Sequence, residues 1–151
     1  MKKSVFTLAA AAAMIGTVAL AQDYSANLKA RQGQFRIMAL NLGILGGMAQ
    51  GKIAYDAEAA QRAADTLVAV SQIDPTPLWP EGSDNMSIDG TRAMPSIWDK
   101  HDDFLAKWGA FGTAAAEMQT VAATGQEALG PMMGKVGGSC KACHDSHREP
   151  N

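Results

Sequence analysis

The sequence predicts an all-α protein, folded as an antiparallel up-and-down four-helix bundle. Four segments carry apolar residues at alternating intervals of three and four, which places them on one face of a helix. No segment shows the sustained apolar–polar alternation that is typical of a strand. Residues 22–151 suffice for one domain with a single core, and four amphipathic helices in one domain indicate a bundle.

The N-terminus has the three parts of a secretory signal peptide. Lys2 and Lys3 precede an apolar run over residues 5–20, which ends in the Ala-Leu-Ala of residues 19–21. The alternative, a buried N-terminal helix, does not account for this tripartite pattern. We therefore expect residues 1–21 to be removed and residues 22–151 to form an exported, periplasmic domain. No other segment is long and apolar enough to cross a bilayer.

The first predicted helix runs from about Asp23 to Gln50, and the second from Asp56 to about Ser71. Gly51 is a suitable stop for the first helix, and the carboxylate of Asp56 favours the N-terminus of the second. The apolar stripe of the first helix consists of Leu28, Phe35, Met38, Leu42, Leu45 and Ala49.

The third predicted helix covers about residues 96–123, and the fourth about residues 126–147. Between the second and third helices, residues 73–94 include three prolines and two glycines. A connection of this length in a compact domain is often functional, and we expect it to run along the bundle and shield one edge of a bound group. The third stripe is Ile97, Phe104, Trp108, Phe111, Ala115, Met118 and Ala122. The fourth is Leu129, Met133, Val136, Cys140, Cys143 and His147.

The charge balance excludes two classes of partner. Without Lys2 and Lys3 the 13 basic side chains become 11, against 15 acidic ones, which gives a formal charge of −4. Such a chain has no basic surface for nucleic acid and no polybasic patch for a membrane.

The distinctive chemistry lies in Cys140-Lys141-Ala142-Cys143-His144, close to the C-terminus. Two cysteines around two residues, followed by a histidine, are the attachment sequence of a c-type haem. Each sulfur adds to one haem vinyl group, and the histidine becomes an axial iron ligand. Both thiols lie on the inward stripe of the last helix, with His144 one turn after Cys140. The sequence therefore predicts one covalent haem c, with His144 as the metal ligand.

Two other uses of the cysteine pair are open. A thioredoxin-like redox pair lies at a helix N-terminus, where the dipole lowers the thiol pKa, whereas this pair lies near a helix C-terminus. A structural zinc site needs four ligands, and the sequence shows no second half for one. Both interpretations are weaker than haem attachment.

With this motif at the end of a helical bundle, the chain resembles the class II c-type cytochromes, and among them the cytochromes c′. The resemblance covers essentially all of residues 22–151. It rests on Arg31-Gln32, the turn from Gly51 to Asp56, Pro95-Ser96-Ile97-Trp98, and the segment from Cys140 to Arg148. Cytochromes c′ are standard examples of up-and-down four-helix bundles, so the fold prediction is not independent of the resemblance.

The resemblance implies further haem contacts. Arg31 and Gln32 fall where the family places side chains beside the haem propionates, although a solvated helix face is the alternative for Arg31. Thr91 matches a haem-contacting position. Arg148 is expected either to approach the imidazole side of the haem or to be a surface arginine. His147 stands where the family usually has an aromatic residue, and we expect it to pack in its place.

Phe35 determines the expected ligation of the iron. In the low-spin class II cytochromes that this chain resembles, the matching position looks to be a methionine, whose sulfur is the sixth ligand of the iron. Phenylalanine cannot ligate, so the resemblance implies five-coordinate iron, with His144 on one side and the Phe35 ring over the other. Met38, one turn away, is the alternative sixth ligand, although such methionines more often pack in the core.

These features favour a periplasmic cytochrome that binds nitric oxide and carbon monoxide, transfers electrons, or does both. Dioxygen needs a distal hydrogen-bond donor, which an apolar pocket lacks, whereas nitric oxide and carbon monoxide need none. The alternative is a low-spin, six-coordinate electron carrier with His/Met ligation. Without a distal His/Arg pair or a second metal cluster in the sequence, we expect no enzymatic activity. The redox partner proteins are not identifiable.

The resemblance also implies a homodimer packed through the first two helices. Gly43, Gly46 and Gly47 lie close together in the first helix. Each glycine costs about 1 kcal/mol relative to alanine in a helix, and we expect close approach of a second subunit to be the reason for them.

Overall fold

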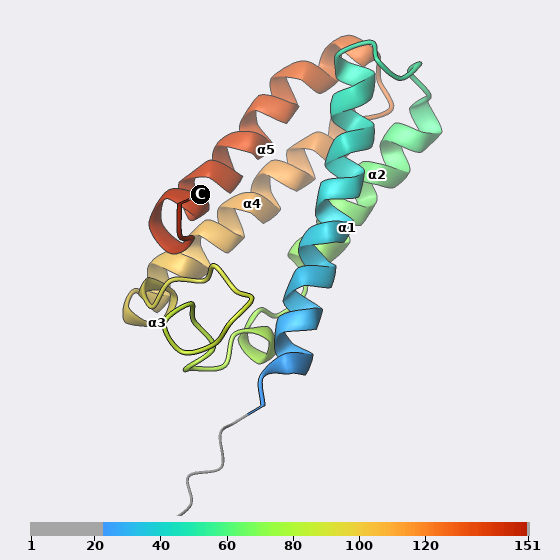
Figure 1. The fold of residues 1–151 in the computed structure, drawn as a ribbon. Helices are drawn as coiled ribbons and strands as arrows, with labels where there is room; N and C mark the ends of the chain where they lie inside the picture. The colour runs from blue at the N-terminus through green and yellow to red at the C-terminus, as the bar shows by residue number, and fades with distance from the viewer. Residues whose placement is uncertain (1–22, 151) are drawn as a thin grey trace, which may run out of the picture.

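The computed structural model describes residues 23–150, and within this range the chain forms helices and no strand. Four long helices run alternately up and down (Figure 1). They are α1 (Ser25–Ala49), α2 (Ala57–Ser71), α4 (His101–Val121) and α5 (Gln126–His147). Two short elements, η1 (Thr76–Leu78) and α3 (Ser96–Asp99), lie between α2 and α4. The predicted antiparallel four-helix bundle is confirmed.

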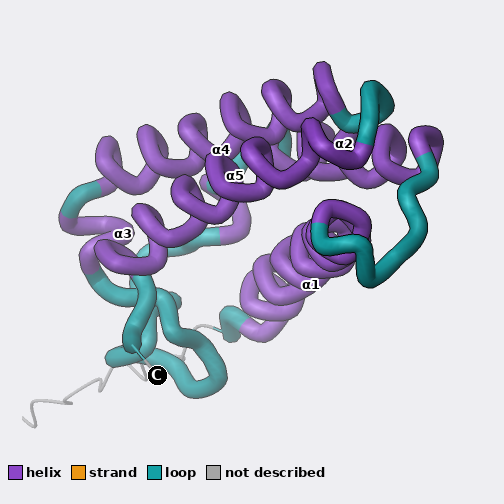
Figure 2. The backbone as a smooth tube through the Cα atoms, turned by 90° about the horizontal axis from the view of Figure 1, so that it is seen from above, coloured by secondary structure: helices purple, strands orange, loops and turns teal. Residues whose placement is uncertain are grey.

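The four long helices pack in a ring. Helix α1 contacts α2 and α5, and α4 contacts the same two helices, so α1 and α4 are diagonal to each other. Figure 2 shows α4 and α5 side by side from above. The core between the helices contains five fully buried side chains, namely Leu45, Leu67, Met118, Leu129 and Val136.

Local signals set several helix ends as predicted. The Asp56 carboxylate accepts a hydrogen bond of 2.7 Å from the Ala59 amide, which satisfies a free donor at the start of α2. Gly51 has φ +68°, a left-handed conformation that glycine adopts without steric cost, and the chain turns there after α1. Helix α5 has the predicted bounds.

The prediction of one continuous third helix was wrong. Helix α3 ends at Asp99, and Lys100 has the non-helical φ of −127° and ψ of 51° before α4 begins. No proline or glycine marks this break in the sequence. Tertiary contacts hold α3 instead: the Trp98 indole donates to the carbonyl of Trp79 at 3.0 Å, and Ile97 packs with Phe104 in a small second core.

The predicted stripe of α1 was only partly correct. Met38 and Leu45 are buried, as expected, but Phe35 is 39% exposed. The buried face of α1 also carries polar side chains, namely Arg31, Gln34 and Asn41. The reason is that one side of α1 faces a cavity instead of the core, as described below.

The long connection closes one end of the bundle. The segment between α2 and α3 lies at the same end as the C-terminus (Figure 1). It is tied to the end of α5 by backbone hydrogen bonds from Met94 N to His147 O and from Glu149 N to Arg92 O, at 3.0 and 2.9 Å. A bridge between Ala93 and Arg148 lies between them.

The predicted signal peptide, residues 1–21, lies outside the described residues. Among the helices of residues 23–150, none combines the length and apolarity required to cross a membrane.

Candidate haem-binding site

A cavity of about 660 Å³ lies between α1, α4 and the C-terminal half of α5, with the long connection at one end. This volume is within the usual range for a small-molecule or cofactor site. Every site residue predicted from the sequence lines it. These residues are Arg31, Gln32, Phe35, Thr91, Cys140, Cys143, His144 and Arg148.

The two cysteines are half-buried in the wall of the cavity and are not joined in a disulfide. Burial raises the pKa of both thiols, which is opposite to the lowered pKa of a redox-active thiol. Within residues 23–150, no three His, Cys, Asp or Glu side chains are close enough together to hold a metal ion. The geometry therefore favours neither the redox pair nor the zinc site.

His144 lies on α5, one turn after Cys140, and also lines the cavity. Its pKa is lowered, first by partial burial and then by the positive charges of Arg148 and Arg92. The neutral imidazole, which is the form that binds a metal, is thereby favoured at neutral pH.

Arg31 is almost fully buried, with 2% of its surface exposed. Its guanidinium donates to Oγ and to the backbone O of Ser83 at 3.2 and 3.1 Å, and lies 4.5 Å from the ring centre of Trp79. Burial lowers the pKa of Arg31. The solvated-face alternative for Arg31 is wrong, because this side chain joins α1 to the long connection. Its predicted contact with a propionate stays a prediction.

The other predicted contacts lie around the mouth of the cavity. Gln32 donates to the carbonyl of Gly90 at 3.0 Å, and Thr91 Oγ1 accepts from the amide of Ala93 at 3.1 Å. Both interactions order the end of the connection beside α1. Arg148 is exposed immediately after α5.

Phe35 belongs to an aromatic wall. Its ring makes edge-on contacts with Trp79 and Trp108, at centroid distances of 6.3 and 6.5 Å. Met38 also borders the cavity, but only 6% of it is exposed, and it packs in the main core. Sequence analysis did not identify Trp79 as a site residue, and only its place in a long proline-rich connection could have indicated it.

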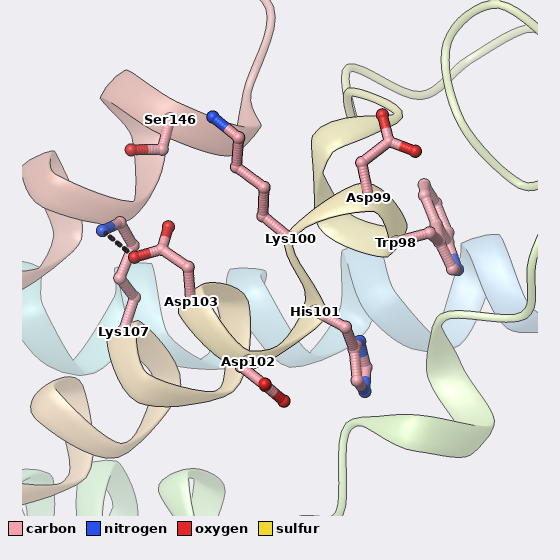
Figure 3. Close-up of a pocket in the computed structure, with 8 residues that line it drawn as sticks. All are labelled: Trp98, Asp99, Lys100, His101, Asp102, Asp103, Lys107 and Ser146. Atoms are coloured by element: carbon pink, nitrogen blue, oxygen red, sulfur yellow. Dashed lines mark hydrogen bonds and ion pairs between the residues drawn. The ribbon is translucent and has the colours of Figure 1, made fainter.

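A polar network behind the site was also missed. His147 is 2% exposed, its Nε2 donates to Asp103 at 3.0 Å, and its Nδ1 lies 3.0 Å from Ser96 Oγ. Asp103 also accepts from Lys107 at 2.9 Å, the pair joined by a dashed line in Figure 3. This bond, followed by the contact with His147, lowers the pKa of Asp103.

Figure 3 shows a second pocket, of about 690 Å³, at the junction of α3 and α4, and of this network it draws Asp103 and Lys107. His147 packs as expected of a residue that replaces an aromatic one. It is buried, and its ring lies edge-on to Phe104, with the ring centroids 6.0 Å apart. The hydrogen bonds are an addition that its position in the sequence did not indicate.

The cavity has the chemistry that haem c requires. An apolar wall would cover the porphyrin, two thiols lie one helical turn apart for the vinyl groups, and an imidazole lies beside them. Two cavity-lining donors, Arg31 Nε and Trp108 Nε1, are buried without a hydrogen-bond partner within residues 23–150. Buried donors of this kind usually have partners, and a bound group with polar edges would supply them.

Comparison with known proteins decides the family. The model of the family described as Cytochrome C′ matches residues 26–148. The chain belongs to the cytochrome c′ family. It is 40% identical to a cytochrome c′ from Cereibacter sphaeroides over 141 residues, which is 93% of this chain and 95% of that protein. It is 37% identical to a cytochrome c-554 from the same organism, over 94% of this chain and 95% of that protein.

Solved structures of the cytochrome c′ family agree with this assignment. A cytochrome c′ structure from Rhodobacter sphaeroides has a TM-score of 0.82 at 40% identity, covering 86% of this chain and all of that one. A nitric oxide complex and a carbon monoxide complex, both of variants of the Alcaligenes xylosoxidans cytochrome c prime, each have a TM-score of 0.73 at 29% identity. They cover 85% of this chain and 97% and 98% of theirs. Family membership implies haem c as the cofactor and a role in electron transport or gas binding.

Proposed function

We propose that this chain carries one haem c, attached through Cys140 and Cys143 with His144 as axial ligand, and that its iron is five-coordinate. The protein would bind nitric oxide and carbon monoxide, transfer single electrons, or do both. When bound, the haem supplies an open coordination position and a one-electron couple. The observation that carries the proposal is that both thiols, His144 and Phe35 line one apolar cavity.

The ligation state is argued from the residues of α1. Phe35 borders the cavity and cannot ligate, whereas the thioether of Met38 is held in the core beside Leu45 and Met48. Moving Met38 to the iron would cost its buried packing, which is worth about 2 kcal/mol. Five-coordinate iron under a displaceable aromatic ring is therefore the better interpretation, and six-coordinate His/Met ligation is the alternative.

The choice of ligand follows from the polarity of the same wall. Phe35, which is proposed to cover the iron, offers no hydrogen-bond donor to a ligand. The indole N–H of the neighbouring Trp108 is assigned above to a polar edge of the bound group and not to the ligand. Dioxygen depends on such a donor, while nitric oxide and carbon monoxide do not. We therefore expect the protein to select these two gases. Complexes of both gases are known for relatives with the same fold.

Absorption spectra of the oxidised, reduced and carbon-monoxide-treated protein test this proposal. The protein is produced with its leader in a host that matures c-type cytochromes, and its mass should exceed that of the polypeptide by one haem. High-spin spectra and binding of carbon monoxide by the reduced protein are expected, for the wild type and for Met38→Leu alike. A low-spin spectrum with a methionine–iron band that Met38→Leu abolishes would support the alternative. A colourless preparation would overturn the proposal altogether.

We further propose export to the periplasm, with cleavage after Ala21, and a non-catalytic role. The tripartite leader supports export, and haem attachment to cysteines belongs to the exported compartment. Both histidines that line the cavity, His144 and His147, lie on α5, so this set lacks the opposed acid–base pair of a peroxidase. N-terminal sequencing of protein from the periplasmic fraction should begin at Gln22.

A homodimer through α1 is the last part of the proposal. Two of the three glycines that suggested it have a reason within the chain: Gly46 packs on Met133, and a side chain at Gly47 would collide with Ile53. The support comes instead from the outward face of α1, where small and apolar residues recur at intervals of four and three. This stripe is Ala26, Ala30, Gly33, Ile37 and Leu40. It includes Leu40, which is 67% exposed.

A further inference from the structure

The lining of the haem cavity has a charge opposite to that of the whole chain. Residues 23–150 contain 15 acidic and 11 basic side chains, yet none of the acidic residues lines the cavity. The cations among its lining residues are Arg31, Arg36, Lys107, Arg92 and Arg148. Nearly half of the cations of an acidic domain therefore surround one opening.

These cations divide into inner and outer groups. The inner group is Arg31, which is buried and donates to Ser83, and Lys107, which forms an ion pair with Asp103. Both side chains therefore already have partners within the protein. Arg36 on α1 and Arg148 after α5 are exposed, and within residues 23–150 no hydrogen bond or ion pair holds either side chain. The charges of the outer group therefore face solvent from two sides of the opening.

Arg92 also lies at the mouth. Its guanidinium donates to the carbonyl oxygen of Glu149, which orients the side chain beside the end of α5. Lys107 is balanced by Asp103, so two haem propionates would face Arg31, Arg36 and Arg148 and would leave a positive excess even without Arg92.

We infer that the mouth of the cavity, marked by the exposed Arg36 and Arg148, is the docking surface for an acidic electron-transfer protein. This inference rests on the proposed function. In the complex, one electron passes from the reduced cofactor of the partner to ferric haem, which becomes ferrous while the partner is oxidised by one electron. Attraction between the arginines and carboxylates around the partner's cofactor brings the two redox groups together and speeds their encounter.

A protein fits this surface better than an anionic membrane does. The domain as a whole has an excess of acidic side chains, so a broad anionic bilayer would repel most of it. Five of the 11 basic side chains of residues 23–150 line one mouth, where no acidic side chain is among the lining residues, and a partner of similar size can touch that mouth without approaching most of the acidic surface. Charge complementarity over a small area is typical of transient redox complexes.

The test uses reduced flavodoxin, an acidic redox protein, as the probe. Stopped-flow mixing with the ferric holoprotein gives the second-order rate of electron transfer from low ionic strength to about 0.5 M salt. For the wild type this rate should fall as salt is added. The double variant Arg36→Gln/Arg148→Gln should react about 5- to 10-fold more slowly at low salt and equal the wild type at high salt.

Lys52→Gln is the matched control, because it removes one positive charge at the opposite end of the bundle. Lys52 is exposed in the turn after α1. This turn lies beside the start of α5 (Figure 1), where Gly51 is close to the side chain of Gln126. The 22 residues of α5 separate that turn from Arg148 by about 33 Å, which is about three Debye lengths at 0.1 M salt, so the low-salt comparison is made at about this ionic strength. This variant should keep the wild-type rate within about twofold. Calorimetric titration with oxidised flavodoxin measures binding without electron transfer, and it should show that the wild type and Lys52→Gln bind more tightly than the double variant.

Three results would overturn the inference: a rate that rises with salt, a double variant as fast as the wild type at low salt, or equal losses in the double variant and Lys52→Gln. Arginine-dependent sedimentation with phosphatidylserine vesicles, together with an unaltered flavodoxin rate, would assign the surface to a membrane. Carbon monoxide binding and reduction by dithionite, measured on the same samples, test the proposed function separately. If those fail, the cofactor assignment is at fault rather than the docking surface.

Discussion

Phe35 controls access to the proposed ligand side of the haem. Its ring must leave two edge-on aromatic contacts before a gas can enter, and such contacts are worth about 0.5–1.5 kcal/mol each. Phe35→Ala should therefore raise the rate of carbon monoxide association with the ferrous protein about tenfold or more, as measured by flash photolysis. Met38→Leu, which changes a buried neighbour on the same helix, should stay within twofold. Equal effects of the two variants would refute this role for Phe35.

His147 connects the last helix to its neighbours. Its ring is buried and joins Asp103 on α4 and Ser96 on α3, so truncation removes two hydrogen bonds and leaves a cavity. His147→Ala should lower the free energy of unfolding by about 2–3 kcal/mol, measured by chemical denaturation of the haem protein. His101→Ala, at an exposed histidine, should cost less than about 0.5 kcal/mol. A loss of similar size in both variants would contradict this account of the network.

At the scale of the elements, the sequence was sufficient to predict a helix end where residues close to that end determine it. The start of α2 at the Asp56 cap and both ends of α5 follow from the sequence. The break at Lys100 does not, because α3 is held by contacts with residues distant in the chain, such as Trp79. The stripe of α1 was misjudged for a related reason: periodicity marks an apolar face but does not distinguish a core from a cofactor cavity.

Helices α2 and α4 are joined by a polar contact with a defined pH dependence. The side chains of Gln61 and Gln119 both donate to the carboxylate of Asp65, at 2.8 and 2.9 Å. Hydrogen bonds from Gln119 first, and then from Gln61, lower the pKa of Asp65 below that of the unfolded chain. The resulting stabilisation is present above the unfolded pKa of about 3.9 and is lost as the pH falls through the lower, folded pKa.

Asp65→Asn should therefore be less stable than the wild type at pH 7, and the difference should disappear as the pH falls through the lowered pKa of Asp65 in the folded protein. Because Asp65 is exposed to solvent, the effect should be small. Denaturation curves collected from pH 7 to pH 2 measure the difference. Asp102→Asn, at an exposed carboxylate of α4, is the control, and a difference that persists unchanged to pH 2 would argue against the contact.

At the scale of the whole molecule, the sequence predicted the residues proposed to attach the haem but not the packing around them. The spacing of Cys140, Cys143 and His144 is local and specific, so it could be recognised directly. The burial of Arg31 depends on Ser83, 52 residues away, and that of His147 on Asp103, 44 residues away. Such pairs depend on how the helices and the long connection pack, which no local pattern contains.

The outward stripe of α1 makes a prediction about assembly. Ile37 and Leu40 are 47% and 67% exposed on one face of the helix, with small residues before them that allow a second helix to approach. A symmetric contact would bury this face against its copy, because apolar area removed from water stabilises association by about 25 cal/mol per Å². The haem protein should therefore sediment as a dimer at micromolar concentration.

Leu40→Asp places a charge in the centre of that contact and should convert the dimer to a monomer. Leu105→Asp is the matched control, since Leu105 is also exposed, at 38%, but lies on α4. It should remain dimeric, and both variants should keep the wild-type absorption spectrum, because neither residue lines the haem cavity. If the wild type sediments as a monomer, or if only Leu105→Asp dissociates, α1 is not the interface, because the contact would then not depend on the apolar face that Leu40 centres.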